Sequence, residues 1–379
     1  MLPIKETQSL RSTVTFRELE FGDYERIATL SSRYGFGTET REEWTHLWVN
    51  NPVSQAVPDW PMGWVLENQN GEIVGHMASV PLLYELGEQR LIACASRALV
   101  VEPQYRSYSF QLLNQFFRQK KIDLFLATTV NAYAVKMFEV FRASRVPVGT
   151  WDKAAFWITD YHGFRASLLK MQDLKAARLL KPLLPAGLLL QDTLRGRWWK
   201  TRSGSVEPES CTGFDERFEN FWQELRNRYP NRLLANRSRA MLEWHFKPLL
   251  AKKWAWVLAL SKDSSLIAYA IFVRRDNPVY SLTRIRLVDF QSLRDDQELL
   301  RPLLCCALER CRQEGIHMLE AVGFPPEKQK VIDRLSPRWR KLDAWRYFYK
   351  AGTPDLAERL KDPKRWDPSC FDGDASLLT

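Results

Sequence analysis

Residues 96–131 read SRALVVEPQYRSYSFQLLNQFFRQKKIDLFLATTVN, and this stretch decides the predicted fold. The apolar run 98–101 predicts a strand, and the polar residues 102–106, with Pro103, predict a turn after it. A helix is predicted from Ser107 to about Lys121, followed by a second strand over 123–129. The N–H groups of a first helical turn have no partner within the helix, so a strand–turn–helix unit of this kind can bind a phosphate group.

The residues on either side of this stretch extend the pattern. Alternating or apolar runs, and turn signals such as Asn68-Gln69-Asn70-Gly71, predict a strand, two helices and hairpin strands before it. These elements are expected at 15–19, 23–34, 42–49, 63–67 and 73–94. A helix over 131–141 and a last pair of strands over 145–158 follow it. The predicted order is therefore β-α-α-β-β-β-α-β-α-β.

A similar order of signals begins again in the second half of the chain, at offsets of roughly 190 to 200 residues. The helix pattern of 215–229 matches that of 23–34, and the strand pattern of 286–289 matches that of 98–101. Single matches are weak, but their common order predicts a duplication.

The order of elements, with an apolar strand that enters Val101-Glu102-Pro103-Gln104-Tyr105-Arg106, resembles the GNAT superfamily of acyl-CoA-dependent N-acyltransferases. Asn131, Ala134 and Phe138 resemble the segment that lies beside the pantetheine arm in that family. The two halves together resemble Fem-type aminoacyltransferases and acetyltransferase-like proteins of bacterial polysaccharide gene clusters. The resemblance implies an α/β (α+β) fold of two tandem GNAT-like domains, each a mixed, mostly antiparallel sheet flanked by helices.

This resemblance and the composition of the connecting segments divide the chain into five parts. They are a disordered lead (1–14), an N-terminal GNAT-like domain (15–160), a basic aliphatic linker (161–205), a C-terminal GNAT-like domain (206–352) and a polar tail (353–379). The linker carries nine basic and two acidic residues between positions 165 and 202, together with many leucines and the pair Trp198-Trp199. It is expected either to cover a domain junction or to make a peripheral contact with an anionic membrane.

The resemblance implies an acyl-CoA or acetyl-CoA co-substrate and no metal. The residues expected to bind that co-substrate are Val100, Val101, Arg106, Ser107, Tyr108, Ser109, Phe110, Gln111 and Asn131. The family has small residues, mostly glycine, where this chain has Ser107, Ser109 and Gln111, and it often has a general-acid tyrosine where this chain has Phe138. Glycine allows close approach of the backbone to a phosphate, so these differences weaken the expected site.

Acylation of an amine needs a base that accepts the proton of the amine. Two residues could serve as this base, namely Glu102 at the end of the strand and His76 on a neighbouring strand. Tyr105 and Tyr108, at the start of the helix, are alternative acids. The sequence leaves this choice open.

Composition and charge limit the remaining functions. The 379 residues are 45% hydrophobic and 26% charged, the formal net charge is +10, and no run of 18 apolar residues is present. The six cysteines form no C-x-x-C pair, which predicts free thiols in a reducing, cytoplasmic environment.

The predicted function is acyl transfer to an amine, with a sugar or cell-envelope precursor as acceptor. The alternatives are a non-catalytic GNAT-fold scaffold and a Fem-like aminoacyltransferase, whose tRNA substrate the positive charge would suit.

Overall fold

The computed structural model describes residues 14–171, apart from 36, 38 and 150, and residues 207–377. Most of the predicted lead (1–14) and most of the predicted linker (161–205) lie outside these described residues. The chain forms two compact units. The first unit comprises Met1–Pro81 and Cys94–Lys121, and the second comprises Leu82–Ala93 and Ile122–Thr379. The predicted domain boundaries stay a prediction, since these units follow different limits.

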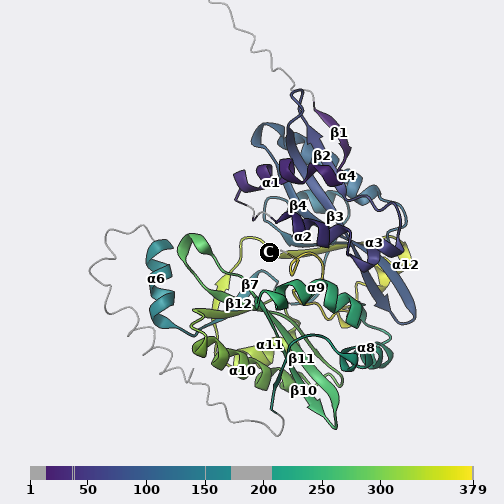
Figure 1. The fold of residues 1–379 in the computed structure, drawn as a ribbon. Helices are drawn as coiled ribbons and strands as arrows, with labels where there is room; N and C mark the ends of the chain where they lie inside the picture. The colour runs from purple at the N-terminus through teal and green to yellow at the C-terminus, as the bar shows by residue number, and fades with distance from the viewer. Residues whose placement is uncertain (1–13, 36, 38, 150, 172–206, 378–379) are drawn as a thin grey trace, which may run out of the picture. The chain divides into compact units, whose positions relative to one another are not determined.

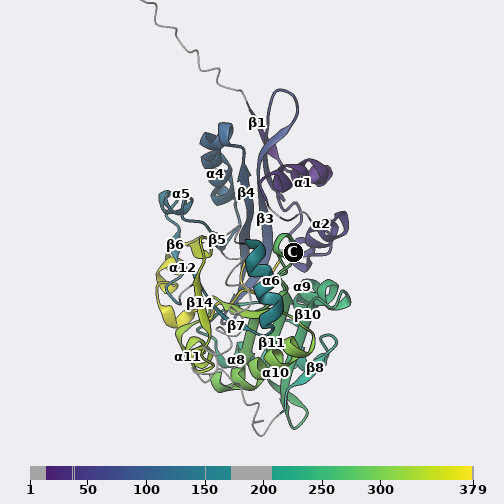
Figure 2. The same cartoon turned by 90° about the vertical axis from the view of Figure 1, so that its left-hand side faces the viewer.

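The first unit is built on an antiparallel sheet in the order β1-β2-β3-β4. Its strands are β1 (Thr15–Glu18), β2 (Gly63–Glu67), β3 (Ile73–Leu86) and β4 (Gln89–Val101), and the hairpin ends of β3 and β4 belong to the second unit. Its helices are α1 (Tyr24–Arg33), α2 (Arg41–Trp48), the short α3 (Pro52–Ala56) and α4 (Ser109–Arg118). Figure 2 shows α4 on one face of this sheet and α1 with α2 on the other.

Local signals explain where these helices begin and which face they bury. The hydroxyl of Thr40 accepts a hydrogen bond from the N–H of Glu43, and the Glu43 carboxylate accepts one from the N–H of Thr40, so a capping box starts α2. On α4, Leu112, Leu113 and Phe116 are fully buried against the sheet.

The second unit contains a seven-stranded mixed sheet in the order β14-β7-β13-β12-β11-β10-β8. These strands are β7 (Lys153–Ile158), β8 (Glu209–Cys211), β10 (Ala255–Lys262), β11 (Ser265–Arg274), β12 (Arg284–Ser292), β13 (Met318–Val322) and β14 (Arg338–Lys341). Among the described strands of this sheet, only β12 and β13 pair in parallel. Figure 1 shows α10 (Leu300–Gln313) and α11 (Pro326–Arg334) beside this sheet, and their apolar residues complete its core.

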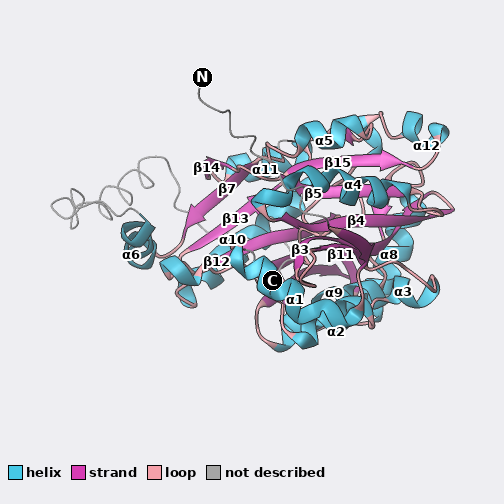
Figure 3. Cartoon of the chain, turned by 90° about the horizontal axis from the view of Figure 1, so that it is seen from above, coloured by secondary structure: helices cyan, strands magenta, loops and turns pink. Residues whose placement is uncertain are grey.

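The other strands of the second unit are β5 (Leu124–Val130), β6 (Ser144–Arg145), β9 (Leu233–Ala235) and β15 (Arg346–Ala351). β15 lies between β5 and β6, as Figure 3 shows for β5, and β9 pairs with the hairpin end of β3. Two strands, β7 and β15, each pair with strands from the other half of the chain. β7 comes from the first half of the chain and joins the seven-stranded sheet, whereas β15 comes from the second half and pairs with β5 and β6.

The remaining helices of the second unit are α5 (Val135–Val140), α6 (Tyr161–Met171), α8 (Glu216–Arg228), α9 (Arg239–Ala251) and α12 (Pro354–Arg359). After α12 the chain continues into residues 366–376, which we call the C-terminal segment. All of its residues are buried except Asp367, which is half-buried. The polar tail expected from the sequence therefore ends as part of the interior.

The predicted fold class is confirmed, because the protein is a mixed α/β structure whose mostly antiparallel sheets are flanked by helices. The order of elements predicted for 15–158 is also confirmed, with the short α3 added. Within the described part of the chain all six cysteines are free, as expected, and three of them are buried. No helix among the described residues has the length and apolar character needed to cross a bilayer.

Candidate functional site

The candidate site lies in the first unit, where β4 ends and α4 begins. Ala98 has a left-handed backbone conformation (φ 51°), which is unusual within a strand and marks an irregularity just before Val100. A 3-10 turn, Pro103–Tyr108, connects β4 to α4, which begins at Ser109. The predicted strand–turn–helix unit is therefore present, with its α-helix starting two residues later than expected.

The side chains of this unit separate into a buried and an exposed set. Val100 and Tyr105 are buried, as is Ser109 at the first position of α4, while Val101 and Tyr108 are half-buried. The exposed residues of the turn and of the first helical turn are Arg106, Ser107, Phe110 and Gln111. Phe110 is 45% exposed, which is high for a large apolar residue. The N-terminus of α4 thus presents a cation, two uncharged polar groups and an aromatic ring to solvent.

Glu102 closes β4 and is only 7% exposed. Its N–H donates to the carbonyl of Val74 over 2.9 Å, which pairs the end of β4 with β3. Its carboxylate forms an ion pair with Arg33 of α1 and accepts a hydrogen bond of 2.9 Å from the amide of Gln104. The Arg33 side chain is 58% exposed, so the cation that covers this carboxylate lies at the surface and is not packed in the interior.

His76, the second candidate base, lies on β3 opposite Val65 of β2 and is 2% exposed. Its Nε2 is 3.1 Å from the hydroxyl of Ser31 on α1, and its Nδ1 has no hydrogen-bond partner among the described residues. Burial lowers the pKa of His76 to about 4, and the positive charge of Arg97 contributes to this decrease. The imidazole is therefore neutral at pH 7 and shielded from solvent by α1.

Asn131 is the one predicted site residue that belongs to the second unit. It is exposed, and its side-chain oxygen accepts a hydrogen bond of 3.0 Å from the N–H of Ala134, so it caps the turn before α5. Phe138 is buried, and its ring lies 5.6 Å from that of Phe348 on β15. The other predicted site residues, eleven in all with the candidate bases, lie in the first unit.

The second sheet has a comparable place, at the end of the parallel pair β12 and β13. The two strands pair from Arg284 with Met318 to Leu287 with Ala321, and beyond this point β12 pairs only with β11. The C-terminal segment occupies the space that opens there. Ser369 donates to Asp289 of β12 over 2.8 Å, and the thiol of Cys370 donates to the carbonyl of Val322 of β13 over 3.3 Å.

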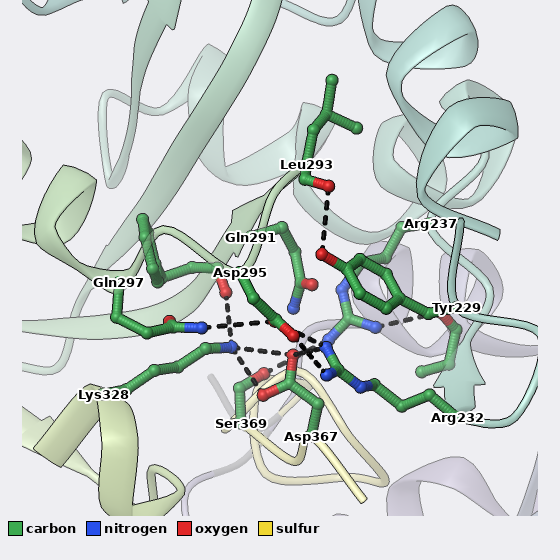
Figure 4. A network of polar contacts seen from close by, with 12 residues as sticks. Tyr229, Arg232, Arg237, Gln291, Leu293, Asp295, Gln297, Lys328, Asp367 and Ser369 are labelled. Carbon is green, nitrogen blue, oxygen red and sulfur yellow. Dashed lines mark hydrogen bonds and ion pairs between the residues drawn. The ribbon is translucent and has the colours of Figure 1, made fainter. Parts of the chain in front are cut away.

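Buried charges hold the C-terminal segment in this place. Arg237, before α9, binds both carboxylate oxygens of Asp289 at 2.7 and 3.0 Å and lies 3.6 Å from Asp372. Burial alone would raise the pKa of Asp289, but Arg237 outweighs it and holds the pKa below the usual value. Figure 4 shows Lys328 and Arg232 directed at Asp367, with ion-pair distances of 2.7 and 3.8 Å.

Known structures resemble this protein over most of its length. A GCN5-related N-acetyltransferase from Anabaena variabilis superposes with a TM-score of 0.52 and 10% identity, over 89% of this chain and 73% of that one. A GCN5-related N-acetyltransferase from Kribbella flavida superposes with a TM-score of 0.53 and 10% identity, over 91% of this chain and 72% of that one. N-myristoyltransferase of Saccharomyces cerevisiae, with bound myristoyl-CoA, superposes with a TM-score of 0.57 and 11% identity, over 92% of this chain and 81% of that one.

The chain has the GNAT fold. The predicted resemblance to the GNAT superfamily is thereby confirmed at the level of the fold, whereas the tandem duplication stays a prediction. No protein-family model matches the sequence, and no curated protein matches it. With identities of 10 to 11%, the likeness to these proteins is one of three-dimensional structure.

Sequence reasoning missed several partners of the candidate residues. Arg33, which pairs with Glu102, is 69 positions away, and Ser31 is 45 positions from His76. Each pair joins α1 to a strand, so no spacing in the sequence reports it. The burial of the C-terminal segment was also missed, because residues such as Asp372 and Ser376 are typical of exposed tails.

Proposed function

We propose that this protein is an acyltransferase that moves an acyl group from acyl-CoA to an amine. The observation that carries the proposal is the end of β4 with its 3-10 turn and the exposed N-terminus of α4, set in a GNAT fold. Two lines of support agree with it. The structural neighbours are named as acetyltransferases and as a myristoyltransferase with bound myristoyl-CoA, and the turn offers the groups that a CoA pyrophosphate needs.

In this proposal the pyrophosphate binds at the N-terminus of α4, where backbone N–H groups and the helix dipole favour negative charge. Arg106 supplies a full positive charge, and Ser107 supplies a hydroxyl donor. Gln111 replaces a small residue of the family, but its side chain is exposed and can turn aside. Ser109 is the position at which close backbone approach matters most, because it is buried at the first turn.

Glu102 is the residue that we propose as proton acceptor. Its carboxylate lies at the end of β4, and its partner Arg33 is largely exposed, so an incoming ammonium group can replace the guanidinium there. His76 is less suitable, because a group with a pKa near 4 is a weak base at neutral pH and the side chain is covered by α1. The acceptor class, a sugar or cell-envelope precursor, and a cytoplasmic or membrane-peripheral location belong to the proposal and rest on the resemblance alone.

A non-catalytic scaffold is the second candidate. It is favoured by the second sheet, where the C-terminal segment fills the space beyond the parallel pair, and by the serines and glutamine at the positions of the family's small residues. The transfer from tRNA and the membrane contact of residues 165–202 stay predictions.

Calorimetric titration with acetyl-CoA and with myristoyl-CoA tests the proposed function. Gln111→Glu places a negative charge beside the pyrophosphate and should weaken binding about tenfold or more, without loss of folding, because an acidic residue suits a helix N-terminus. Gln115→Glu, one turn further along α4, makes the same change away from the N-terminus and is the matched control. The proposal is wrong if neither thioester gives heat, and the scaffold is then the better explanation.

A further inference from the structure

Three arginines of the second unit surround a single buried glutamate. Glu320 of β13 is fully buried. Arg286 of β12 donates to its Oε1 from Nε over 2.7 Å, and Nη2 of Arg286 forms an ion pair with the same oxygen at 2.5 Å. Arg340 of β14 donates to the other oxygen over 2.7 Å, and Arg284 lies 3.9 Å from it. We call Arg284, Arg286 and Arg340 the arginine cluster.

The arginine cluster carries more positive charge than its carboxylate can balance. One glutamate faces three guanidinium groups, so two positive charges remain. Asp276 also acts on Arg284, but it already forms an ion pair of 2.6 Å with Arg274. Burial lowers the pKa of Arg284, Glu320 raises it, and Arg286 and Arg340 lower it further, which reflects the excess of positive charge. Excess buried charge of this kind favours the uptake of an anion.

The arginine cluster lies on the face of the sheet that is turned away from the helices. Ile285, Leu287 and Leu319 belong to the core formed with α10 and α11. Side chains alternate along a strand, so Arg284, Arg286 and Glu320 point to the opposite face. Arg340 and Arg284 keep 38% and 24% of their side chains exposed, so the cluster opens to solvent on the side of these two residues.

Trp345 adds a second feature to the site. Its ring covers Arg286, with the guanidinium carbon 4.5 Å from the ring centroid. Its backbone φ is +78°, a conformation that a bulky side chain adopts at a cost, and strained residues of this kind cluster at functional sites. In addition, Nε of Arg340 is buried and has no hydrogen-bond partner among the described residues. A donor without an acceptor indicates that the site is completed by another group.

We propose that the arginine cluster binds a phosphate group, either free or carried by a small molecule. Guanidinium groups bind phosphate oxygens through N–H donors, which suits the unpaired Nε of Arg340 and the charge excess. A small ligand is favoured over a nucleic acid, because Arg286 is enclosed by Trp345 and only two arginines of the cluster reach the surface. The turn and helix proposed to bind the CoA pyrophosphate belong to the first unit, whereas the arginine cluster belongs to the second.

Binding of inorganic phosphate and of glucose 6-phosphate to the full chain tests the proposal. Arg340→Gln should weaken both about tenfold or more, since a charge-assisted hydrogen bond is lost. Lys341→Gln removes the same charge from the next residue of β14, on the other face, and should leave binding unchanged. Stronger binding of the sugar phosphate would identify an organic ligand, and equal binding would identify free phosphate. An equal loss in the two variants overturns the proposal, as does binding of tRNA but of neither phosphate.

Arg340→Lys separates a loss of binding from a loss of folding, because it keeps a cation beside Glu320 but removes the planar guanidinium donors. It should weaken phosphate binding severalfold at an unchanged melting temperature. For the unaltered protein, the ³¹P signal of millimolar phosphate should broaden, and chloride of equal ionic strength should not prevent it. A sharp ³¹P signal, or broadening that chloride abolishes, overturns the proposal without any variant.

Discussion

Replacing Gly373 by alanine tests how closely the C-terminal segment packs on β5. Gly373 has a φ of +73°, and a Cβ atom at this position would lie 2.4 Å from Cγ2 of Thr128. Thr128 is 1% exposed and belongs to β5, so its methyl group cannot move into solvent. The neighbouring Asp374 accepts a hydrogen bond from the hydroxyl of Thr128, which fixes the register of the segment on the strand.

Two terms add to the expected cost. A left-handed conformation costs an alanine about 1–2 kcal/mol relative to glycine, and forcing a methyl group into a packed interior costs about 1–3 kcal/mol. Gly373→Ala should therefore lower the free energy of unfolding by about 2–5 kcal/mol. Gly315→Ala is the matched control, because Gly315 has a φ of +64° but no described atom lies within 4 Å of its Cβ position. Gly315→Ala should therefore show only the cost of the left-handed backbone conformation.

Urea denaturation followed by tryptophan fluorescence measures both changes. A second substitution separates packing from backbone strain, because Thr128→Ser removes the methyl group that the added Cβ would meet and keeps the hydroxyl that binds Asp374. In the Thr128→Ser background, Gly373→Ala should cost no more than Gly315→Ala, which a double-mutant cycle detects as a coupling energy. Equal costs for Gly373→Ala and Gly315→Ala in the unaltered background would refute the packing of the C-terminal segment described above.

Three further predictions concern charged groups. Arg237→Met leaves the fully buried Asp289 without its cation and should lower the free energy of unfolding by about 3–5 kcal/mol. Arg228→Met breaks an exposed pair with Glu224 and should cost less than about 1 kcal/mol. Denaturant titration of both variants measures the two costs. His76 has a folded pKa of about 4 and an unfolded value of 6.5, so its contribution to stability is present above pH 6.5 and is lost as the pH falls to 4. This loss is about 3 kcal/mol. In His76→Gln the free energy of unfolding should depend less steeply on pH between 6.5 and 4, and an unchanged pH dependence would contradict the burial of the neutral imidazole. Glu102→Gln should lower kcat about 10²–10⁴-fold with little change in acyl-CoA affinity if Glu102 is the proton acceptor, and an unaltered kcat in steady-state assays would exclude that role.

The sequence was sufficient where local signals decide the structure. The run 98–101 with its turn at Pro103 correctly predicted the end of β4 and the start of α4, because apolar periodicity and proline act within a few residues. The helix predicted at 42–49 matches α2, since Thr40 and Glu43 form its capping box over three positions.

Long-range pairing could not be predicted in the same way. The strands predicted at 145–158 exist, but they lie in different sheets, and nothing in the residues of β7 indicates that its neighbours are β13 and β14. The same holds for the candidate site. Its exposed turn follows from local sequence, whereas the contacts of Glu102 with Arg33 and of His76 with Ser31 depend on how α1 packs on the sheet.

The exchange of β7 and β15 has a consequence for the synthesis of this protein. β5 and β6 leave the ribosome well before β15, the strand that pairs with both of them. Likewise β7 must wait, with its edges unpaired, for β13 and β14. Contacts so distant in sequence slow folding and expose edges to aggregation. Expressing either half of the chain alone should therefore yield insoluble protein, and co-translational folding should depend on chaperones that shield the early strands.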